Sequence, residues 1–309
     1  MQPSAVANTI NLTASPSQFY SWQNYRCAYE VHQPIDTTHE GVPLLLIHPI
    51  GVGLSRQFWQ RFCRQWYDAG QRNPIYNSDL LGCGESDMPH VAYTPDNWAE
   101  QLQYFLQTVV RKPVIIVVQG ALLPVAVQLV QKESNLIAGL VLSGPPAWAL
   151  MTNKSPEWRR KVLWNLFDSP FGSAFYRYAR TPKFLRSFST RQLFASDNSV
   201  DAEWLNTLVA GAENLASRHA VFSFLAGFWR QDYTSYIASI GQPTLAVVGE
   251  TASSISQDNR KETPDERLAH YLACLPQGRG IKINGRNVLP YESTAEFVAA
   301  IATFINELS

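Results

Sequence analysis

The sequence predicts an α/β protein in which helices flank a mostly parallel central sheet and a helical cap is inserted into the chain. Short apolar runs such as Val114–Val118, rich in β-branched residues, are typical of strands covered on both faces. These runs alternate with segments of helical periodicity. Between residues 148 and 240 they give way to aromatic, helix-like segments, which indicates an insertion. A length of 309 residues suits one such domain.

The first half of the chain alternates strand and helix patterns. Aromatic residues alternating with polar ones predict two antiparallel strands at the start, and Pro43–Ile47 predicts a buried strand after them. Ser55 is the expected N-cap of the next helix, and Thr94 followed by Pro95 is the expected start of another. The strands expected before the insertion are Phe19–Trp22, Tyr25–Val31, Pro43–Ile47, a short strand beginning at Pro74, Val114–Val118 and Ile137–Ser143.

The segment 112–130 predicts a buried strand, a tight turn and a helix, and the rest of the chain is organised around it. Pro124 falls in the first turn of the helix, where its missing N–H costs nothing. Such a strand-turn-helix presents the nucleophile of some enzymes at the tip of its turn. That position holds Gly120, or Leu122 in a shifted register, so neither register offers Ser, Cys or Asp. Glycine adopts positive φ freely, so the turn can persist without the chemistry.

Strand and helix patterns return after the insertion. Pro243–Val248 and Gly280–Ile283 predict two further strands. Thr263–Glu266 and Ser293–Glu296 each match a capping box, in which the two outer side chains bond reciprocally to the main chain at a helix start. The expected organisation is a disordered lead at 1–18, a core at 19–147 and 241–309, and a helical cap at 148–240.

Composition excludes several classes of protein. The 25 basic and 25 acidic residues cancel, so no basic excess favours nucleic acid as a partner. The four cysteines have neither CxxC nor metal-ligand spacing, which favours reduced structural thiols and predicts neither a metal site nor a cofactor. The first 18 residues lack the regions of a secretory signal, so the cytoplasm is the expected location.

Several short motifs carry a resemblance to a known family. They are His48–Gly51, the glycine turn of Asp79–Asp87, the turn at Gly120, the strand ending at Val248–Glu250, and the closing helix. Together they resemble an α/β-hydrolase from about residue 19 to the end, which implies the α/β-hydrolase fold. Gly51–Trp59 and Gly285–Glu292 also resemble a triad-lacking, hydrolase-like subgroup from cyanobacteria and plastids. That likeness implies a role in photosynthetic membranes.

The resemblance implies a catalytic triad of nucleophile, histidine and acid, but the matching positions have lost that chemistry. The nucleophile position is Gly120, the acid position is Ala252, and the histidine position, counted back from the final helix, is Asn287. Asparagine takes up no proton near neutral pH, and no histidine follows His270. No catalytic residue is therefore predicted. We expect a catalytically degenerate hydrolase that binds a small apolar ligand or a partner protein.

The expected ligand site surrounds the central turn. It comprises His48, Pro49, Ile50, Gly51, Gln119, Gly120, Ala121, Ser143, Trp148 and Asn287. A rival hypothesis keeps catalysis, as a hydrolase or lyase that acts on a small ester-like or amide-like substrate through His48, Cys83 or Ser143. His48 more simply shapes its loop by hydrogen bonding, and nothing nearby in sequence lowers the pKa of Cys83.

The insertion carries a local charge. Residues 154–191 contain nine basic side chains, two acidic ones and nine aromatic ones. Two interpretations stay open, a solvated roof over the pocket or a surface that docks on an anionic membrane or an acidic partner. Taken with the resemblance to the cyanobacterial and plastid subgroup, the second interpretation implies peripheral contact with the thylakoid membrane. Its expected interaction residues are Arg159, Arg160, Lys161, Arg177 and Arg180.

Overall fold

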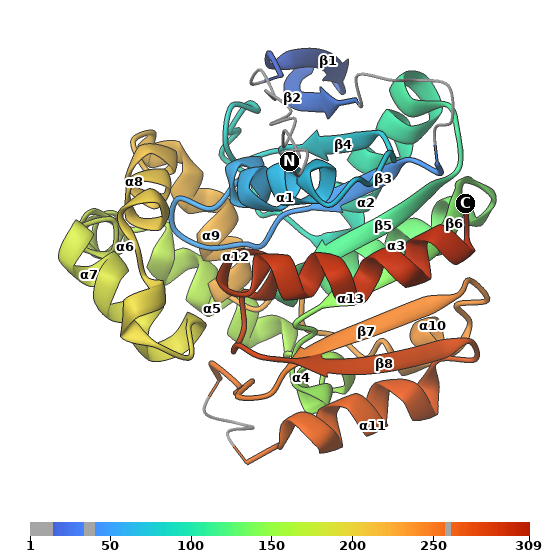
Figure 1. Cartoon of the computed structure of the whole chain (residues 1–309). Helices are drawn as coiled ribbons and strands as arrows, with labels where there is room; N and C mark the ends of the chain where they lie inside the picture. The colour runs from blue at the N-terminus through green and yellow to red at the C-terminus, as the bar shows by residue number, and fades with distance from the viewer. Residues whose placement is uncertain (1–14, 34–40, 257–260) are drawn as a thin grey trace, which may run out of the picture.

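The computed structural model describes residues 15–33, 41–256 and 261–309, which contain an eight-stranded sheet with the strand order β1-β2-β4-β3-β5-β6-β7-β8 (Figure 1). β2 pairs antiparallel with β1 and β4, and the other neighbours pair in parallel. The strands are β1 (Gln18–Trp22), β2 (Tyr25–His32), β3 (Leu44–Ile47), β4 (Ile75–Ser78), β5 (Val114–Gln119), β6 (Ile137–Ser143), β7 (Thr244–Gly249) and β8 (Gly278–Ile283). The predicted architecture, a mostly parallel central sheet flanked by helices, is confirmed.

Helices cover both faces of the sheet. α1 (Gln60–Asp68) and α13 (Thr294–Glu307) pack together across one face and lie in front of the sheet in Figure 1. α2 (Pro95–Phe105), α3 (Leu123–Glu133) and α11 (Pro264–Cys274) contribute to the core on the other face. Alternate residues of β5 enter the two cores. This explains why the predicted strand, Val114–Val118, is apolar throughout.

Three helix caps predicted from the sequence can be compared with the structure. Thr94 accepts a hydrogen bond from the main-chain N–H of Asn97 and caps α2, and Thr263 forms the predicted capping box of α11. The capping box predicted at Ser293–Glu296 is wrong. Both of its side chains bond instead to Asn284, since Ser293 donates to the Asn284 carbonyl and Glu296 accepts from the Asn284 N–H. The loop after β8 therefore takes the groups that would have capped α13.

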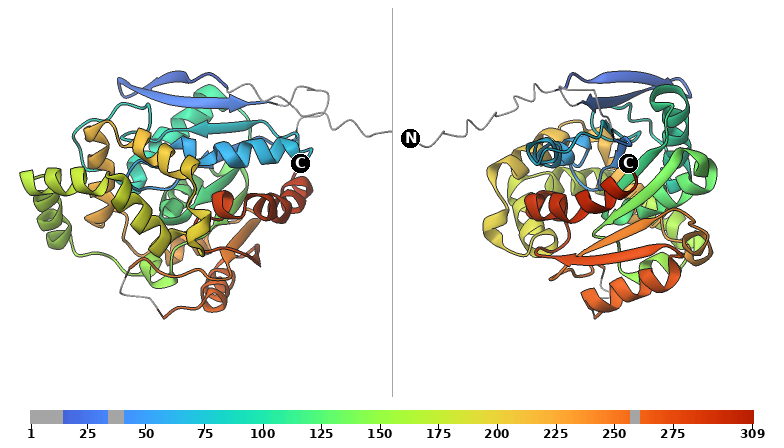
Figure 2. Two further views of the ribbon diagram at one scale, coloured as in Figure 1. Left: turned by 60° about the vertical axis from the view of Figure 1, so that its left-hand side comes forward. Right: turned by 45° about the vertical axis from the view of Figure 1, so that its right-hand side comes forward.

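Residues 148–240, the predicted cap, contain helices and no strand. α4 (Trp148–Thr152) packs on α11 and α10 (Thr234–Ala238) packs on α3, so the two ends of this segment lie against the core. The five helices between them stand beside one end of the sheet in all three views (Figures 1 and 2). They are α5 (Glu157–Phe167), α6 (Pro170–Ala179), α7 (Pro182–Phe188), α8 (Ala202–Gly211) and α9 (Arg218–Leu225).

Short helical turns complete the chain. They are Arg56–Trp59, Leu106–Val110, Gly120–Leu122, Ser134–Leu136, Ser189–Leu193, Asp197–Ser199, Leu215–Ser217 and α12 (Leu289–Glu292). Most of the predicted disordered lead, residues 1–14, lies outside the described residues. Its last part belongs to the fold, because Ser17 accepts a 2.7 Å hydrogen bond from Arg56 and β1 begins at Gln18. Within the described ranges, no helix is both long enough and apolar enough to cross a bilayer.

Candidate functional site

Gly120 occupies the tip of the turn between β5 and α3 and has a φ of +62°. A Cβ atom built on it would lie 4.0 Å from its nearest neighbour, the carbonyl oxygen of Gly144. The turn therefore keeps the left-handed conformation of a nucleophile elbow and leaves room for a side chain. The shifted register is wrong, because Leu122 is fully buried.

The three degenerate triad positions converge at this edge of the sheet. Asn287 lies in the loop after β8, and its side-chain amide donates to the carbonyls of Ser253 (3.0 Å) and Gln192 (2.7 Å). Ser253 directly follows Ala252, the acid position, which is buried. The three positions therefore lie close together, although none of their side chains can take up or donate a catalytic proton.

Gln119 connects the ends of three segments. Its Nε2 donates to the main-chain carbonyl of Asn287 at 2.6 Å, and its Oε1 accepts a 2.7 Å hydrogen bond from the hydroxyl of Ser143. Gln119 and Ser143 are paired in register on β5 and β6. Ser143 is completely buried and does not line the pocket described next. Ser143 was predicted to belong to the ligand site, but in the structure its hydroxyl makes an internal hydrogen bond to Gln119 instead.

A cavity of about 490 Å³ opens over the turn. Its sheet side is formed by the turn at Gly120 and by the loops after β3, β6, β7 and β8, and its cap side by apolar side chains such as Leu163, Phe184 and Leu208. Seven of the ten predicted ligand residues line it, namely Pro49, Ile50, Gly51, Gln119, Gly120, Ala121 and Asn287.

His48 and Trp148 are not on the wall of this pocket. The Nε2 of His48 accepts from the N–H of Leu80 at 3.2 Å, and its Nδ1 lies 2.7 Å from the carbonyl of Pro49. Burial lowers the pKa of His48, so the ring is neutral and Nδ1–H is the donor. The ring of Trp148 packs against Tyr271, with centroids 5.1 Å apart. Both side chains are structural.

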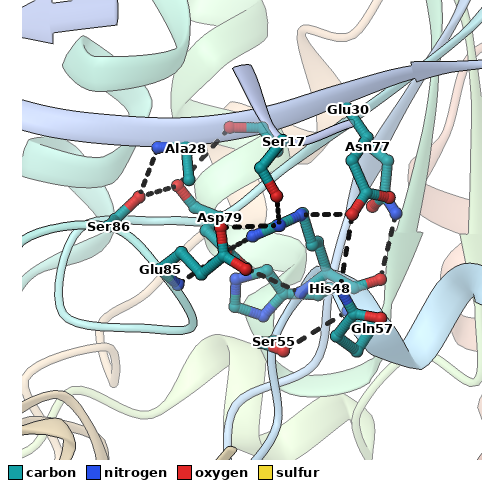
Figure 3. Close-up of polar contacts among 12 residues, drawn as sticks. Ser17, Ala28, Glu30, His48, Ser55, Gln57, Asn77, Asp79, Glu85 and Ser86 are labelled. Carbon is teal, nitrogen blue, oxygen red and sulfur yellow. Dashed lines mark hydrogen bonds and ion pairs between the residues drawn. The ribbon is translucent and has the colours of Figure 1, made fainter. Parts of the chain in front are cut away.

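A buried network holds the loops after β3 and β4 (Figure 3). Arg56 pairs with Asp79, and its Nε donates to Glu30 at 2.9 Å. Asp79 also accepts from the main-chain N–H groups of Arg56 (2.8 Å) and Glu85 (2.9 Å). Burial alone would lower the pKa of Arg56, but Asp79 and Glu30 raise it above its usual value. The network fixes the loop that carries the 49–54 wall of the pocket.

Three arginines line the pocket that the ligand prediction did not include, Arg159, Arg230 and Arg267. Arg267 is 2% exposed. Its Nε donates to Glu262 at 2.9 Å, and its Nη2 has no hydrogen-bond partner among the described residues. No sequence pattern marks Arg267 as a pocket residue, because a single basic residue in a helix is usually solvated. Only the fold shows that its side chain is buried at the pocket wall.

The described part of the pocket wall contains few ionisable side chains. Among the described residues that line it there is no aspartate, glutamate, histidine, cysteine or lysine. Cys83 is buried elsewhere, and burial raises the pKa of its thiol, so it is not a ready thiolate. Two main-chain elements of an oxyanion site do border the cavity, Ala121 after the elbow and Ile50 in the loop after β3.

The five predicted interaction residues do not share one environment. Arg159 is exposed and also lines the pocket, while Lys161 pairs with Glu157 at 2.8 Å and Arg177 is exposed. Arg160 and Arg180 are half-buried. Arg160 lies 5.8 Å from the ring centre of Phe228, and Arg180 donates to the carbonyl of Glu213 at 3.2 Å.

The nine aromatic residues of this segment divide in the same way. Trp158, Phe171 and Tyr178 are 69%, 80% and 61% exposed, and Phe175 is exposed at the pocket wall. The other five, Trp164, Phe167, Tyr176, Phe184 and Phe188, are buried or half-buried. The cap therefore both roofs the pocket and presents an apolar outer face.

Comparisons with known proteins agree on the fold. The sequence profile described as the alpha/beta hydrolase family matches residues 44–301. An esterase from Thermogutta terrifontis is 17% identical, with a TM-score of 0.71 over 95% of this chain and 99% of that one. A bromoperoxidase from Bacillus anthracis is 16% identical, with a TM-score of 0.71 over 94% and 100% of the two chains. A mutant haloalkane dehalogenase from Agrobacterium tumefaciens C58 is 14% identical, with a TM-score of 0.69 over 94% and 97%.

Identities this low establish the fold and leave the activity open. No curated protein matches the chain.

Proposed function

Because the chain belongs to the α/β-hydrolase family, we propose that it keeps the pocket of a hydrolase and binds a ligand there without cleaving it. The observation that carries this proposal is the elbow itself, where Gly120 keeps the turn at a φ of +62° but supplies no nucleophile. A nucleophile also needs a base to activate it. The described wall of the pocket contains no histidine or carboxylate that would serve.

The pocket wall favours an amphiphilic ligand with a hydrocarbon body and a carboxylate head, such as a long-chain fatty acid. Leucine and phenylalanine side chains of the cap supply an apolar roof. Arg267 supplies a buried donor, Nη2, that lacks a partner. A buried donor left unpaired is costly, and a carboxylate oxygen would pair it. Arg159 adds a second positive charge at the wall.

The rival function, a hydrolase or lyase with a non-standard set of groups, has weaker support. His48, Cys83 and Ser143 are all buried, and none of them lines the pocket. A water or substrate in the cavity would have no route to them without rearrangement of the loops. Family membership favours this rival, and labelling with a fluorophosphonate serine probe distinguishes the two functions.

Binding of a fluorescently labelled palmitate to the purified, full-length protein tests the proposal. We expect saturable binding that unlabelled palmitate displaces and that palmityl alcohol displaces more weakly. Arg267→Gln should weaken binding by roughly tenfold or more, the usual size of a lost hydrogen bond to a charged group. Arg279→Gln, the same substitution at an exposed arginine outside the pocket, is the matched control and should change nothing.

No saturable binding, or equal affinity for acid and alcohol, would overturn the proposed head-group recognition. The acid-to-alcohol comparison uses the unmodified protein, so it remains decisive if Arg267→Gln fails to fold.

A second candidate function, peripheral docking on an anionic bilayer, rests on the outer face of the cap. Trp158, Val162 and Leu166 on α5 recur at intervals of four and are all more than half exposed. Phe171 and Tyr178 extend this apolar face onto α6. Monomeric proteins seldom leave such a set of large apolar side chains uncovered without a partner. The surrounding basic residues fit an anionic lipid surface.

The resemblance of the sequence to a cyanobacterial and plastid subgroup is the only support for a thylakoid membrane as this bilayer. Co-sedimentation with vesicles tests docking. We expect binding to vesicles containing phosphatidylglycerol and little binding to pure phosphatidylcholine, and we expect Trp158→Ser with Phe171→Ser to abolish it. Binding to a membrane extract but not to protein-free vesicles would overturn lipid docking and favour a protein partner.

A further inference from the structure

Three side chains from distant parts of the chain meet outside the pocket. His90 lies in the loop between β4 and α2, Asp168 follows α5, and His219 is in the first turn of α9. One nitrogen or carboxylate oxygen from each residue lies within 4.8 Å of the corresponding atoms of the other two. None of the three lines the ligand cavity. The cluster therefore joins the core to two helices of the cap and is independent of the proposed function.

His219 is the anomalous member of the cluster. Its side chain is 4% exposed, and its Nδ1 is buried without a hydrogen-bond partner among the described residues. A neutral imidazole keeps a lone pair on one ring nitrogen, which a metal ion can use. An unpaired buried nitrogen calls for a physical explanation.

His90 and Asp168 are already in contact. The Nε2 of His90 lies 2.6 Å from Oδ1 of Asp168, and the rings of His90 and His219 stack with centroids 4.2 Å apart. Zinc binds nitrogen and oxygen at about 2.0–2.2 Å, so two ligands at a tetrahedral angle lie roughly 3.4 Å apart. A metal ion binds an imidazole nitrogen in the plane of the ring, so coordination requires His90 to turn out of this stack. The side chain of His90 is 60% exposed and has room to turn.

We propose that His90, Asp168 and His219 bind a divalent transition-metal ion, Zn²⁺ in the first place, and that this ion clips the cap to the core. Two imidazoles and one carboxylate are three ligands of the kind zinc takes, with the fourth position left to water. Mg²⁺ and Ca²⁺ prefer all-oxygen sites and should not bind. The simpler arrangement, an ion pair between His90 and Asp168, leaves the buried Nδ1 of His219 without a partner among the described residues.

This site was not expected from the sequence. The three residues are separated by 78 and 51 positions, so no metal-binding spacing exists for a pattern to detect. The prediction of no metal site rested on the cysteines alone.

Isothermal titration of the tag-free protein, stripped with a chelator, with Zn²⁺ tests the proposal. We expect one equivalent to bind, and we expect Asp168→Asn and His90→Gln, both at exposed positions, to weaken binding at least tenfold. His219→Ala should weaken it further. His270→Ala is the matched control, because His270 is also exposed and also faces one carboxylate, Glu262 at 3.4 Å, but has no third ligand.

Substitution with Co²⁺ gives a second readout, because the absorption spectrum separates nitrogen and oxygen ligands from thiolate ligands. A spectrum without sulfur charge-transfer bands supports the cluster, and strong bands of that kind would assign the ion to a cysteine and overturn the proposal. Wild-type affinity in both Asp168→Asn and His90→Gln would also overturn it. We further expect one equivalent of Zn²⁺ to raise the melting temperature of the wild type but not of Asp168→Asn.

Discussion

The side-chain amide of Gln119 donates a 2.6 Å hydrogen bond to the main-chain carbonyl of Asn287. This contact ties the strand that leads into the elbow to the loop that carries the degenerate histidine position. Ser143 completes the link by donating to the other end of the same amide. The edge of the sheet is therefore held in the shape of a hydrolase site by hydrogen bonds that need no triad.

No covalent labelling by a fluorophosphonate probe is expected for the wild type, because the elbow lacks a nucleophile. Gly120→Ser should fold, since its Cβ would have a nearest neighbour at 4.0 Å. Holding serine at positive φ costs roughly 1–2 kcal/mol. This variant should also stay unlabelled without a base beside it. Intact-mass spectrometry is the measurement. A stoichiometric adduct on the wild type would show that another residue is activated, and an adduct on Gly120→Ser alone would show that the new serine reacts without the expected base.

Restoring the whole triad by Gly120→Ser, Ala252→Asp and Asn287→His should still not give an efficient esterase. Val118 and Leu122 are buried where small residues normally let the helix approach the strand. A misplacement of ~1 Å can cost roughly a hundredfold in rate. We expect turnover of a p-nitrophenyl ester at least about a hundredfold below that of an active family member. Comparable turnover would refute the steric explanation, and Gly120→Ser alone is the control.

The sequence predicts the layers of this fold well because its strands are buried on both faces and punctuated by turns. β3 is a continuous apolar run and β5 is apolar as far as Val118, and Thr94 and Thr263 cap helices through purely local hydrogen bonds. The failure at Ser293 has the opposite cause. Its hydroxyl bonds to Asn284 in the loop after β8, and a local pattern does not reveal such a competing partner.

The residues of the site also differ in whether their position depends on neighbours in sequence or on distant parts of the chain. The central turn follows from neighbours in sequence, and Gly120 and its flanks lie on the pocket wall. Arg267 and His219 were missed because their roles depend on residues more than fifty positions away, which only the folded chain brings near. His48 was assigned to the ligand site because it precedes the pocket loop, but its ring turns into the core and bonds to Leu80.

Asp79→Ala should be among the most destabilising single changes in this protein. The substitution removes one partner of the buried Arg56 guanidinium and two acceptors of main-chain N–H groups. Breaking a buried ion pair typically costs about 3–5 kcal/mol. Urea unfolding followed by circular dichroism measures the loss. Asp265→Ala, at an exposed pair with Lys282, should cost less than about 1 kcal/mol, and equal losses would contradict a special role for the network.

Stability should fall as the pH drops below about 6.5, the usual pKa of histidine, in part because of His48. Burial lowers the pKa of His48 in the folded state, so the unfolded chain takes up a proton first and is favoured as the pH falls. Asp79 opposes this shift and Arg56 reinforces it. His48→Gln keeps an acceptor for the N–H of Leu80 but cannot be protonated.

The test of this pH dependence is urea unfolding between about pH 5 and 8, with wild type and His48→Gln compared at each pH. The free energy of unfolding of His48→Gln should depend less on pH than that of the wild type. Parallel curves would mean that His48 is not a source of the acid sensitivity.

Reversing the exposed positive charges of the cap should separate a docking face from a simple lid. The structure selects Arg159, Lys161 and Arg177 for reversal to glutamate, because Arg160 and Arg180 are half-buried against Phe228 and Glu213. Each basic residue near an anionic membrane contributes about 1 kcal/mol. The triple reversal should therefore abolish co-sedimentation with anionic vesicles at low salt. Salt should weaken wild-type binding in the same way, since screening acts on exposed charges.

The matched control reverses three exposed basic residues outside the cap, Arg64, Arg111 and Arg279. It changes the net charge equally but leaves the apolar face of α5 and α6 with its basic rim. If both triple variants lose binding equally, attraction depends on net charge alone and the cap has no special role. If only the cap variant loses binding, the basic rim and the exposed Trp158 and Phe171 act together as one surface.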